Sequence, residues 1–230
     1  MIFALVLMMD LDQIFIFVER LRKEAIGEPM WIREKDAFEY TEQSAKVVAV
    51  LKLVRAAQGV TAVKLLCERG LFVDLGVLVR CVQDCHSEIY FLLEAFPKTS
   101  SNVDQFVKSF FEGTIDGYLS GETHPVQSKK IRNATLRILE AEQNHQMRED
   151  FESVYKTFSG YVHANYAHIM EMYNGETLDF NLAGISDVHP RAIRAEHVEL
   201  AAIEVSHSAA FIAHKIGLKG LFDEIVQSWQ

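Results

Sequence analysis

Apolar residues recur three and four positions apart through most of this chain, the spacing that places them on one face of an α-helix. Turn-forming residues interrupt the pattern at Gly27-Glu28-Pro29, at Gly70 and at Pro97. Between such interruptions the pattern predicts helices at about 10–26, 34–57, 60–69, 72–96, 102–118, 126–147, 148–172, 195–217 and 219–228. The sequence therefore predicts an all-α fold, a multi-helix bundle.

Two segments depart from the average pattern. Residues 72–96 are apolar on most sides and would form a helix about 37 Å long, so we expect them to run through the middle of the bundle. Residues 174–194 lose the helical spacing, and apolar and polar residues alternate there, which predicts an ordered loop with a short extended piece. We expect one helical domain over 1–230, with its bundle core at 10–172 and C-terminal helices at 195–228.

Composition narrows the class of protein. Apolar residues make up 49% of the chain and only four residues are proline, which excludes disorder and is typical of a globular protein with a large core. The formal net charge of -9 gives no general attraction for nucleic acid. Nucleic-acid binding would need a local basic cluster, for which the candidates are Arg20, Arg22 and Lys23, or Lys129, Lys130 and Arg132.

The cysteines and the amino terminus bear on the compartment. Cys67, Cys81 and Cys85 all lie in apolar helical contexts, which favours a reducing, cytoplasmic location. The opening run MIFALVLMM lacks a basic leader, and Asp10 ends it before it could span a bilayer. It therefore predicts neither a targeting signal nor a membrane partner.

The stretch SGYVHANYAHIMEMY, residues 159–173, carries the most unusual polar pattern if it forms one helix. Ser159, His163 and Tyr166 would share one stripe, whereas His163 and His168 would lie about 140° apart and could not easily bind one metal. On the helix at 72–96, Arg80 and Asp84 lie one turn apart within an apolar stripe, which is typical of an ion pair held inside a bundle. A buried histidine needs a polar partner.

These observations predict one polar cluster inside the bundle, made of Arg80, Asp84, Ser159, His163 and Tyr166. In a binding site Asp84 would orient the imidazole of His163, and Arg80 would hold a small anionic ligand such as a phosphate or carboxylate. The alternative is a structural polar network that sets the helix register.

A metal site is the third interpretation of the polar residues. Glu204 and His207 have the Glu-x-x-His spacing that di-iron bundles use, as do Glu142 and His145. The second pair sits in a segment that is hydrophilic all round, and a di-iron site needs two further inward glutamates. We therefore expect no metal and no cofactor, with Glu204 and His207 as the candidates should a metal bind. Gly-rich phosphate loops and Cys-x-x-Cys motifs are missing from the sequence.

Arg80, five residues and then His86 resembles the Arg-x4-6-His motif of the HEPN superfamily. More broadly, GLFVDLGVLVRCVQDCHSEIYFL followed by SGYVHANY looks like uncharacterised bacterial helical proteins grouped with HEPN and abortive-infection families. The resemblance implies a metal-independent ribonuclease, with His86 as general base or acid and Arg80 as phosphate ligand. On a straight helix the two side chains diverge by about 120°, so a shared active site would need a second chain or a bend.

Taken together, the sequence favours a binding or regulatory module, and it leaves open whether the protein is an enzyme. The alternatives are a HEPN-like ribonuclease and a metal-dependent helical-bundle enzyme. We also expect a homo-oligomer, most simply a homodimer, because apolar residues of the amino terminus and of the 195–217 helix exceed what a small bundle could cover. The face concerned consists of Ala201, Val205, Ala209 and Ile212.

Overall fold

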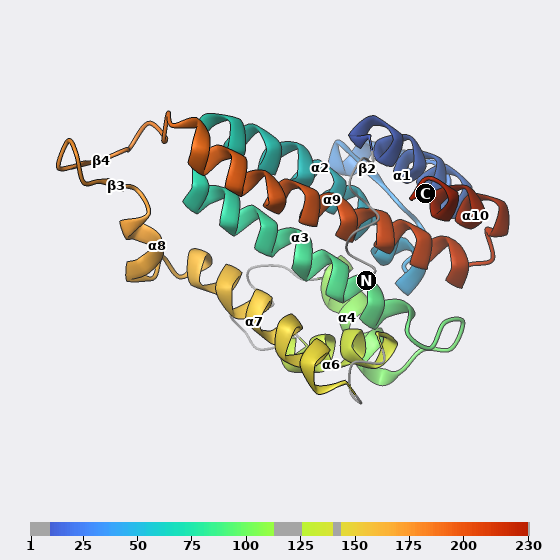
Figure 1. Ribbon diagram of the computed structural model, residues 1–230. Helices are drawn as coiled ribbons and strands as arrows, with labels where there is room; N and C mark the ends of the chain where they lie inside the picture. The colour runs from blue at the N-terminus through green and yellow to red at the C-terminus, as the bar shows by residue number, and fades with distance from the viewer. Residues whose placement is uncertain (1–9, 113–125, 140–143, 230) are drawn as a thin grey trace.

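The computed structural model describes residues 10–112, 126–139 and 144–229. Within these residues the chain forms nine α-helices and two hairpins of two short strands each, so the predicted helical bundle is confirmed (Figure 1). The elements are α1 (Leu11–Ile26), β1 (Met30–Ile32), β2 (Ala37–Glu39), α2 (Ala45–Arg69), α3 (Phe72–Leu93), α4 (Ser101–Glu112), α6 (Ser128–Ile138), α7 (His145–Val162), α8 (Tyr166–Met170), β3 (Tyr173–Asn174), β4 (Asp179–Phe180), α9 (Val188–Lys215) and α10 (Lys219–Gln227).

Helix α3 is the central element, as its apolar sequence predicts. It packs against α2 and α9 on one side and against α6 and α7 on the other (Figure 1). Helices α1 and α10 complete the α2–α9 side of the bundle. Because α3 is covered from both directions, several of its polar residues are buried, namely Arg80, Gln83, His86 and Ser87.

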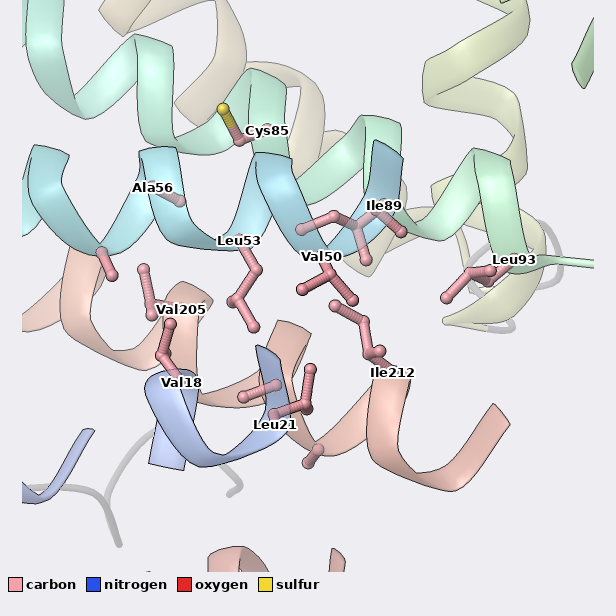
Figure 2. Packing of buried hydrophobic residues seen from close by; sticks show 14 of the residues in the cluster. Val18, Leu21, Val50, Leu53, Ala56, Cys85, Ile89, Leu93, Val205 and Ile212 are labelled. Carbon is pink, nitrogen blue, oxygen red and sulfur yellow. The ribbon is translucent and has the colours of Figure 1, made fainter. Parts of the chain in front are cut away.

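The main core lies where α1, α2, α3 and α9 meet. Figure 2 shows side chains of all four helices directed into this space. The fully buried members include Leu21, Val50, Leu53, Ile89, Val205 and Ile212. Burying each such side chain stabilises the fold by about 1.5–3 kcal/mol, so this cluster dominates the stability of the bundle.

Helix α2 is continuous, whereas the sequence pattern predicted a break between 57 and 60. Gly59, which falls at the predicted break, lies inside the helix and faces α3. A Cβ atom at this position would lie 2.8 Å from Cγ2 of Val82. Gly59 therefore allows two helices to approach closely, and it does not end one.

The predicted start of that helix at residue 34 was also wrong. Residues 30–39 form an antiparallel hairpin in which Trp31 pairs with Phe38, and the two rings lie 4.9 Å apart. Helix α2 begins only at Ala45, where the hydroxyl of Ser44 accepts a hydrogen bond from the backbone N–H of Val47. Each strand of the hairpin has only three residues, so the alternation of apolar and polar residues is too short to be told apart from the helical spacing that follows it.

Helix α7 meets α3 at a second glycine contact. The ring of Tyr161 packs over Gly76 so closely that a Cβ atom there would lie 2.3 Å from Cγ of the ring. Tyr161 is buried, together with Phe158 one turn earlier. This contact holds the C-terminal half of α7 on α3.

The stretch 148–172 does not form one helix. Helix α7 ends at Val162, Ala164 adopts a left-handed conformation with φ 47°, and the short helix α8 follows from Tyr166. Backbone N–H groups of Ala164 and Asn165 donate to the carbonyl groups of Tyr161 and Gly160. This is a helix C-cap built on alanine instead of glycine, so the sequence contains no stop signal.

The segment 174–194 does contain the extended piece that its alternation predicts. Strands β3 and β4 form a hairpin that projects from the end of the bundle (Figure 1). The chain then returns to the bundle, where the backbone N–H of Ile185 donates to the carbonyl of Gly70 at 3.0 Å. Helix α9 begins at Val188, seven residues before the predicted start at 195.

The apolar face of α9, which was predicted to contact a second subunit, is buried within the chain itself. Ala201, Val205, Ala209 and Ile212 are each at most 1% exposed, because α1, α2 and α3 cover them. This argument for a homodimer was wrong, since a sequence shows that a face is apolar but not which helix covers it. Oligomerisation itself stays a prediction.

The opening run of residues 1–9 lies outside the described residues. Among the helices that the structure describes, none combines the length and the apolar character that crossing a membrane requires.

Candidate functional site

Arg80 and Asp84 form the ion pair that their spacing predicts. Nη2 of Arg80 lies 2.7 Å from Oδ1 of Asp84. Arg80 is buried, whereas the side chain of Asp84 is 51% exposed, so the pair lies at the edge of the bundle and not deep inside it. Burial raises the pKa of Asp84, and the charge of Arg80 opposes that rise.

The predicted burial of His163 was wrong. His163 is the C-cap residue of α7 and is exposed, and Tyr166 on α8 is 79% exposed. Ser159 is half-buried, and its backbone carbonyl accepts a hydrogen bond from the N–H of His163. The prediction assumed an unbroken helix through residue 172, but α7 ends at Val162, which leaves His163 at the exposed helix end, and the turn at Ala164 redirects Tyr166. No described contact joins His163 to Arg80 or Asp84.

His163→Ala is therefore expected to change the free energy of unfolding by no more than about 0.5 kcal/mol, as is usual for surface positions. Urea denaturation of the two proteins measures this difference. Tyr161→Ala, two residues earlier but buried on Gly76, is the contrasting variant and should be destabilised by about 3–5 kcal/mol. A loss above about 1 kcal/mol for His163→Ala would show that the imidazole has a structural partner.

The side chain that contacts Arg80 from another helix is Tyr155 of α7. The guanidinium carbon of Arg80 lies 3.5 Å from the centre of the Tyr155 ring, and that of Arg132 on α6 lies 4.1 Å from it. Two cations from different helices therefore lie within cation–π distance of one ring, and this attraction links α3, α7 and α6.

A pocket of about 210 Å³ lies next to Tyr155 and Arg132, between α6 and α7. We call it the α6–α7 pocket. Leu136 and Phe151 form its apolar wall. The charged and aromatic lining consists of Lys129, Arg132, Arg148, Glu152, Tyr155 and Lys156.

The α6–α7 pocket is strongly cationic. Four of its side chains are cations and one is a carboxylate, a net charge of +3, in a chain whose net charge is -9. Glu152 pairs with Arg148 at 3.2 Å and lies 4.0 Å from Lys156. Within the described part of the chain, no carboxylate forms an ion pair with Lys129 or Arg132. These two cations are therefore available to an anionic ligand.

A second polar cluster lies on the opposite side of α3, against α9. Nδ1 of His86 lies 2.8 Å from Oγ of Ser208 and 3.2 Å from the backbone oxygen of Glu204. Burial lowers the pKa of His86 to about 4, so its imidazole is neutral at physiological pH. One turn along α9 from Glu204, the ring of His207 packs edge-on against Trp229 with centres 4.9 Å apart.

Glu204 is the most perturbed acid of this cluster. Burial raises the pKa of its carboxyl to about 8, against the lowering effect of a hydrogen bond from Gln83 and of the charge of Arg80. Oε2 of Glu204 and Oε1 of Gln83 are both buried and make no hydrogen bond within the described chain. A proton on Glu204 would remove a buried charge and make one of its carboxyl oxygens a hydrogen-bond donor, so this environment favours the neutral acid.

The two residues of the Arg-x4-6-His pattern face different helices. Arg80 contacts Tyr155 of α7, and His86 contacts Ser208 of α9. The two side chains diverge as expected on a straight helix, so Arg80 and His86 of one chain do not share a site. The role of either residue in catalysis stays a prediction.

The metal candidates Glu204 and His207 lie on α9 near His86. Nevertheless, the described residues contain no group of three or more histidine, cysteine, aspartate or glutamate side chains that could hold a metal ion. Glu142, the partner of His145 in the other Glu-x-x-His pair, lies outside the described residues.

Sequence reasoning found part of the α6–α7 pocket and missed the rest. Lys129 and Arg132 were identified as part of a basic cluster, but Tyr155, Arg148 and Lys156 were not considered. The missed signal is spacing: residues 148, 152 and 155 share one face of α7, and residues 129, 132 and 136 share one face of α6. Two such faces form a pocket only once the helices are packed side by side.

Comparison with known proteins gives no assignment: no protein-family model, no curated protein and no solved structure matches this chain.

Proposed function

We propose that this protein is a binding module that recognises a small anionic ligand in the α6–α7 pocket. The observation that carries the proposal is the net charge of +3 around one concave site of a chain with a net charge of -9. A general basic surface would attract any polyanion, whereas the net charge of -9 disfavours polyanions and these four cations favour an anion at one site. The site therefore favours an anion small enough to enter the pocket.

The volume of the pocket limits the ligand. About 210 Å³ corresponds to the space of about seven water molecules, and most pockets for drug-sized ligands span roughly 300–1,000 Å³. A single anionic group with a compact organic portion fits this volume. The apolar wall of Leu136 and Phe151 supplies a surface for that portion.

Arg80 takes a different role from the one expected at the outset. It does not line the pocket, and its charge is partly balanced by Asp84. Instead its guanidinium lies against the ring of Tyr155, which also contacts the guanidinium of Arg132 beside the pocket. We assign Arg80 and Asp84 as supports of the binding site and Arg132 as its principal ligand-binding residue.

The ribonuclease and metal-enzyme alternatives have less support. A general base at His86 would have to reach its substrate, but the imidazole is buried against Ser208. Glu204 and His207 are not accompanied by a third suitable ligand within the described chain.

Arg132→Ala is expected to weaken the binding of inorganic phosphate at least about tenfold, because it removes a guanidinium that forms no ion pair with a carboxylate of the described residues. Isothermal titration calorimetry on the full chain measures the affinity, and thermal unfolding with and without phosphate provides a second readout. Lys129→Ala should weaken binding as well, though less, since an ammonium group offers no bidentate geometry.

Lys64→Ala is the matched control, because Lys64 is an exposed lysine on α2 that does not line the pocket. Its phosphate affinity should equal that of the wild type. Absence of saturable binding of phosphate, sulfate and acetate to the wild type would overturn the proposal, as would equal affinities for wild type and Arg132→Ala.

A further inference from the structure

We infer that the α6–α7 pocket selects the dianionic phosphate group of a small phosphomonoester. The inference rests on the proposed function and narrows it from anions in general to one chemical class. It follows from three features of the pocket. The lining has a net positive charge, the guanidinium of Arg132 is held against Tyr155, and the ring of Tyr155 is already in contact with two guanidinium groups.

The charge balance favours a dianion. With one carboxylate among four cations, the lining keeps a net charge of +3. A carboxylate or a phosphodiester carries a single negative charge and would leave most of this positive charge uncompensated in a concave site. A phosphomonoester carries up to two negative charges near neutral pH and offers three terminal oxygens as acceptors. The two guanidinium and two ammonium groups of the lining carry N–H donors for all three oxygens.

The guanidinium of Arg132 is held before any ligand binds. It lies against the Tyr155 ring at 4.1 Å, the ring rests on Arg80 at 3.5 Å, and Arg80 pairs with Asp84 at 2.7 Å. This chain of contacts runs from α6 through α7 to α3. A donor fork held in one orientation loses less conformational entropy when an anion binds, and it favours ligands with several acceptor oxygens in fixed geometry.

The contacts of Arg80 and Arg132 with the Tyr155 ring also argue against single-stranded nucleic acid as the ligand. Proteins that bind single strands commonly stack bases on exposed aromatic rings beside a basic groove. Here the guanidinium groups of Arg80 and Arg132 lie 3.5 Å and 4.1 Å from the centre of the Tyr155 ring, so a base would have to displace one of them to stack closely on it. Its role is to position Arg132. The pocket volume of about 210 Å³ also suits one phosphate group with a compact substituent better than a continuous strand.

A pH profile distinguishes the dianion from other anions. The second pKa of a phosphomonoester is about 6, so its dianionic fraction rises from about a tenth at pH 5 to nearly all at pH 7.5. The charged groups of the pocket are Lys129, Arg132, Arg148, Lys156 and Glu152, and none of the lining residues is histidine. His145, at the start of α7, lies 3.4 Å from Glu149 and does not line the pocket. The ligand, not the pocket, therefore provides the pH dependence.

The test is calorimetric titration of the full chain with methyl phosphate, dimethyl phosphate and sulfate at pH 5.0 and pH 7.5. The association constant of methyl phosphate should rise about tenfold between the two pH values, in proportion to its dianionic fraction. Sulfate is a dianion at both values, so its affinity should stay constant. Dimethyl phosphate, a monoanion, should bind at least about tenfold more weakly than methyl phosphate at pH 7.5.

Variants at Tyr155 test the positioning role. Tyr155→Phe keeps the ring in contact with the two guanidinium groups and should retain the affinity for methyl phosphate. Tyr155→Leu removes it and should weaken that affinity several-fold while leaving the pH profile unchanged, because the ligand still titrates. Retention of full affinity by Tyr155→Leu would contradict the positioning role.

Three outcomes would overturn the inference. Dimethyl phosphate could bind as tightly as methyl phosphate, sulfate could show the same pH dependence as methyl phosphate, or an oligonucleotide without terminal phosphates could displace methyl phosphate. If sulfate and acetate bind in a manner sensitive to Arg132→Ala but without preference for the dianion, this inference fails and the proposed function stands. If none of the anions binds, both fail.

Discussion

Glu204→Gln is expected to stabilise the protein at pH 7.5 and to flatten the dependence of its stability on pH between about 5 and 8. Glu204 has its carboxyl buried between α9 and α3, where Gln83 donates a hydrogen bond to it. The pKa of this carboxyl is raised from 4.5 to about 8. A glutamine carries a donor and an acceptor in the positions that the neutral acid would use, so it can pair with Gln83 at every pH.

The direction follows from proton linkage. Between pH 4.5 and pH 8 the folded state keeps a proton on Glu204 that the unfolded state releases, so stability falls as pH rises through this window. The slope approaches about 1.4 kcal/mol per pH unit, which makes the loss between pH 5 and pH 7 roughly 2–3 kcal/mol. The charged residues that act on Glu204 are Arg80, which lowers its pKa, and Asp84, which raises it.

Urea denaturation at pH 5, 6, 7 and 8 measures this effect. The free energy of unfolding of the wild type should fall across the series, and that of Glu204→Gln should fall less. Glu199→Gln is the matched control, because Glu199 is an exposed glutamate on the same helix. Parallel curves for wild type and Glu204→Gln would show that Glu204 is already ionised in the folded protein.

Gly70→Ala is expected to destabilise the fold by about 2–4 kcal/mol, a large effect for the addition of one methyl group. Gly70 ends α2 with a φ of +69°, a conformation that side chains with a Cβ rarely adopt. An added Cβ would also lie 2.1 Å from the backbone oxygen of Ile185. Because that oxygen belongs to the backbone, the clash can be removed only if the chain around Ile185, where it returns to the bundle after β4, moves away from Gly70.

Gly220→Ala provides a control of opposite sign. Gly220 lies in α10 with no atom within 4 Å of an added Cβ, so alanine should stabilise the helix by up to about 1 kcal/mol. Thermal unfolding of the three proteins separates the two effects. Equal stability of Gly70→Ala and the wild type would mean that the junction between α2 and residue 185 is not closely packed.

Helix α3 organises both polar clusters of the protein. Its Arg80 supports the α6–α7 pocket through Tyr155, and its Gln83 and His86 face α9. Substitutions at Arg80 should therefore affect ligand binding, whereas substitutions at Glu204 should affect stability. If Arg80 variants lose ligand affinity and Glu204 variants change only in stability, the first position belongs to a binding site and the second to a structural polar network. The sequence alone left these two interpretations open.

The pairing of Arg80 with Asp84 illustrates what could be predicted. Both residues lie on one helix, and the distance between side chains one turn apart depends only on helix geometry. The same holds for the alternation at residues 178–182, which correctly indicated a break in the helical pattern near strand β4. Short-range geometry is contained in the order of residues along the chain.

His163 and Tyr155 illustrate what could not. The expected burial of His163 depended on helix α7 continuing, yet α7 ends at Val162 and the chain turns at the left-handed Ala164. Tyr155 gave no signal by itself, because its importance comes from Arg80 and Arg132 on two other helices. The apolar face of α9 was visible in the sequence, but the choice between a second subunit and α1, α2 and α3 as its cover was not.

The sequence by itself determined the helical class, the central position of α3 and the local ion pair, because periodicity and spacing act within a single helix. The tertiary structure decided the location of the pocket, the raised pKa of Glu204 and the close approaches at Gly59, Gly70 and Gly76. The physical reason is that burial, electrostatic environment and steric contact arise between elements far apart in the chain. They exist only when packing brings those elements together.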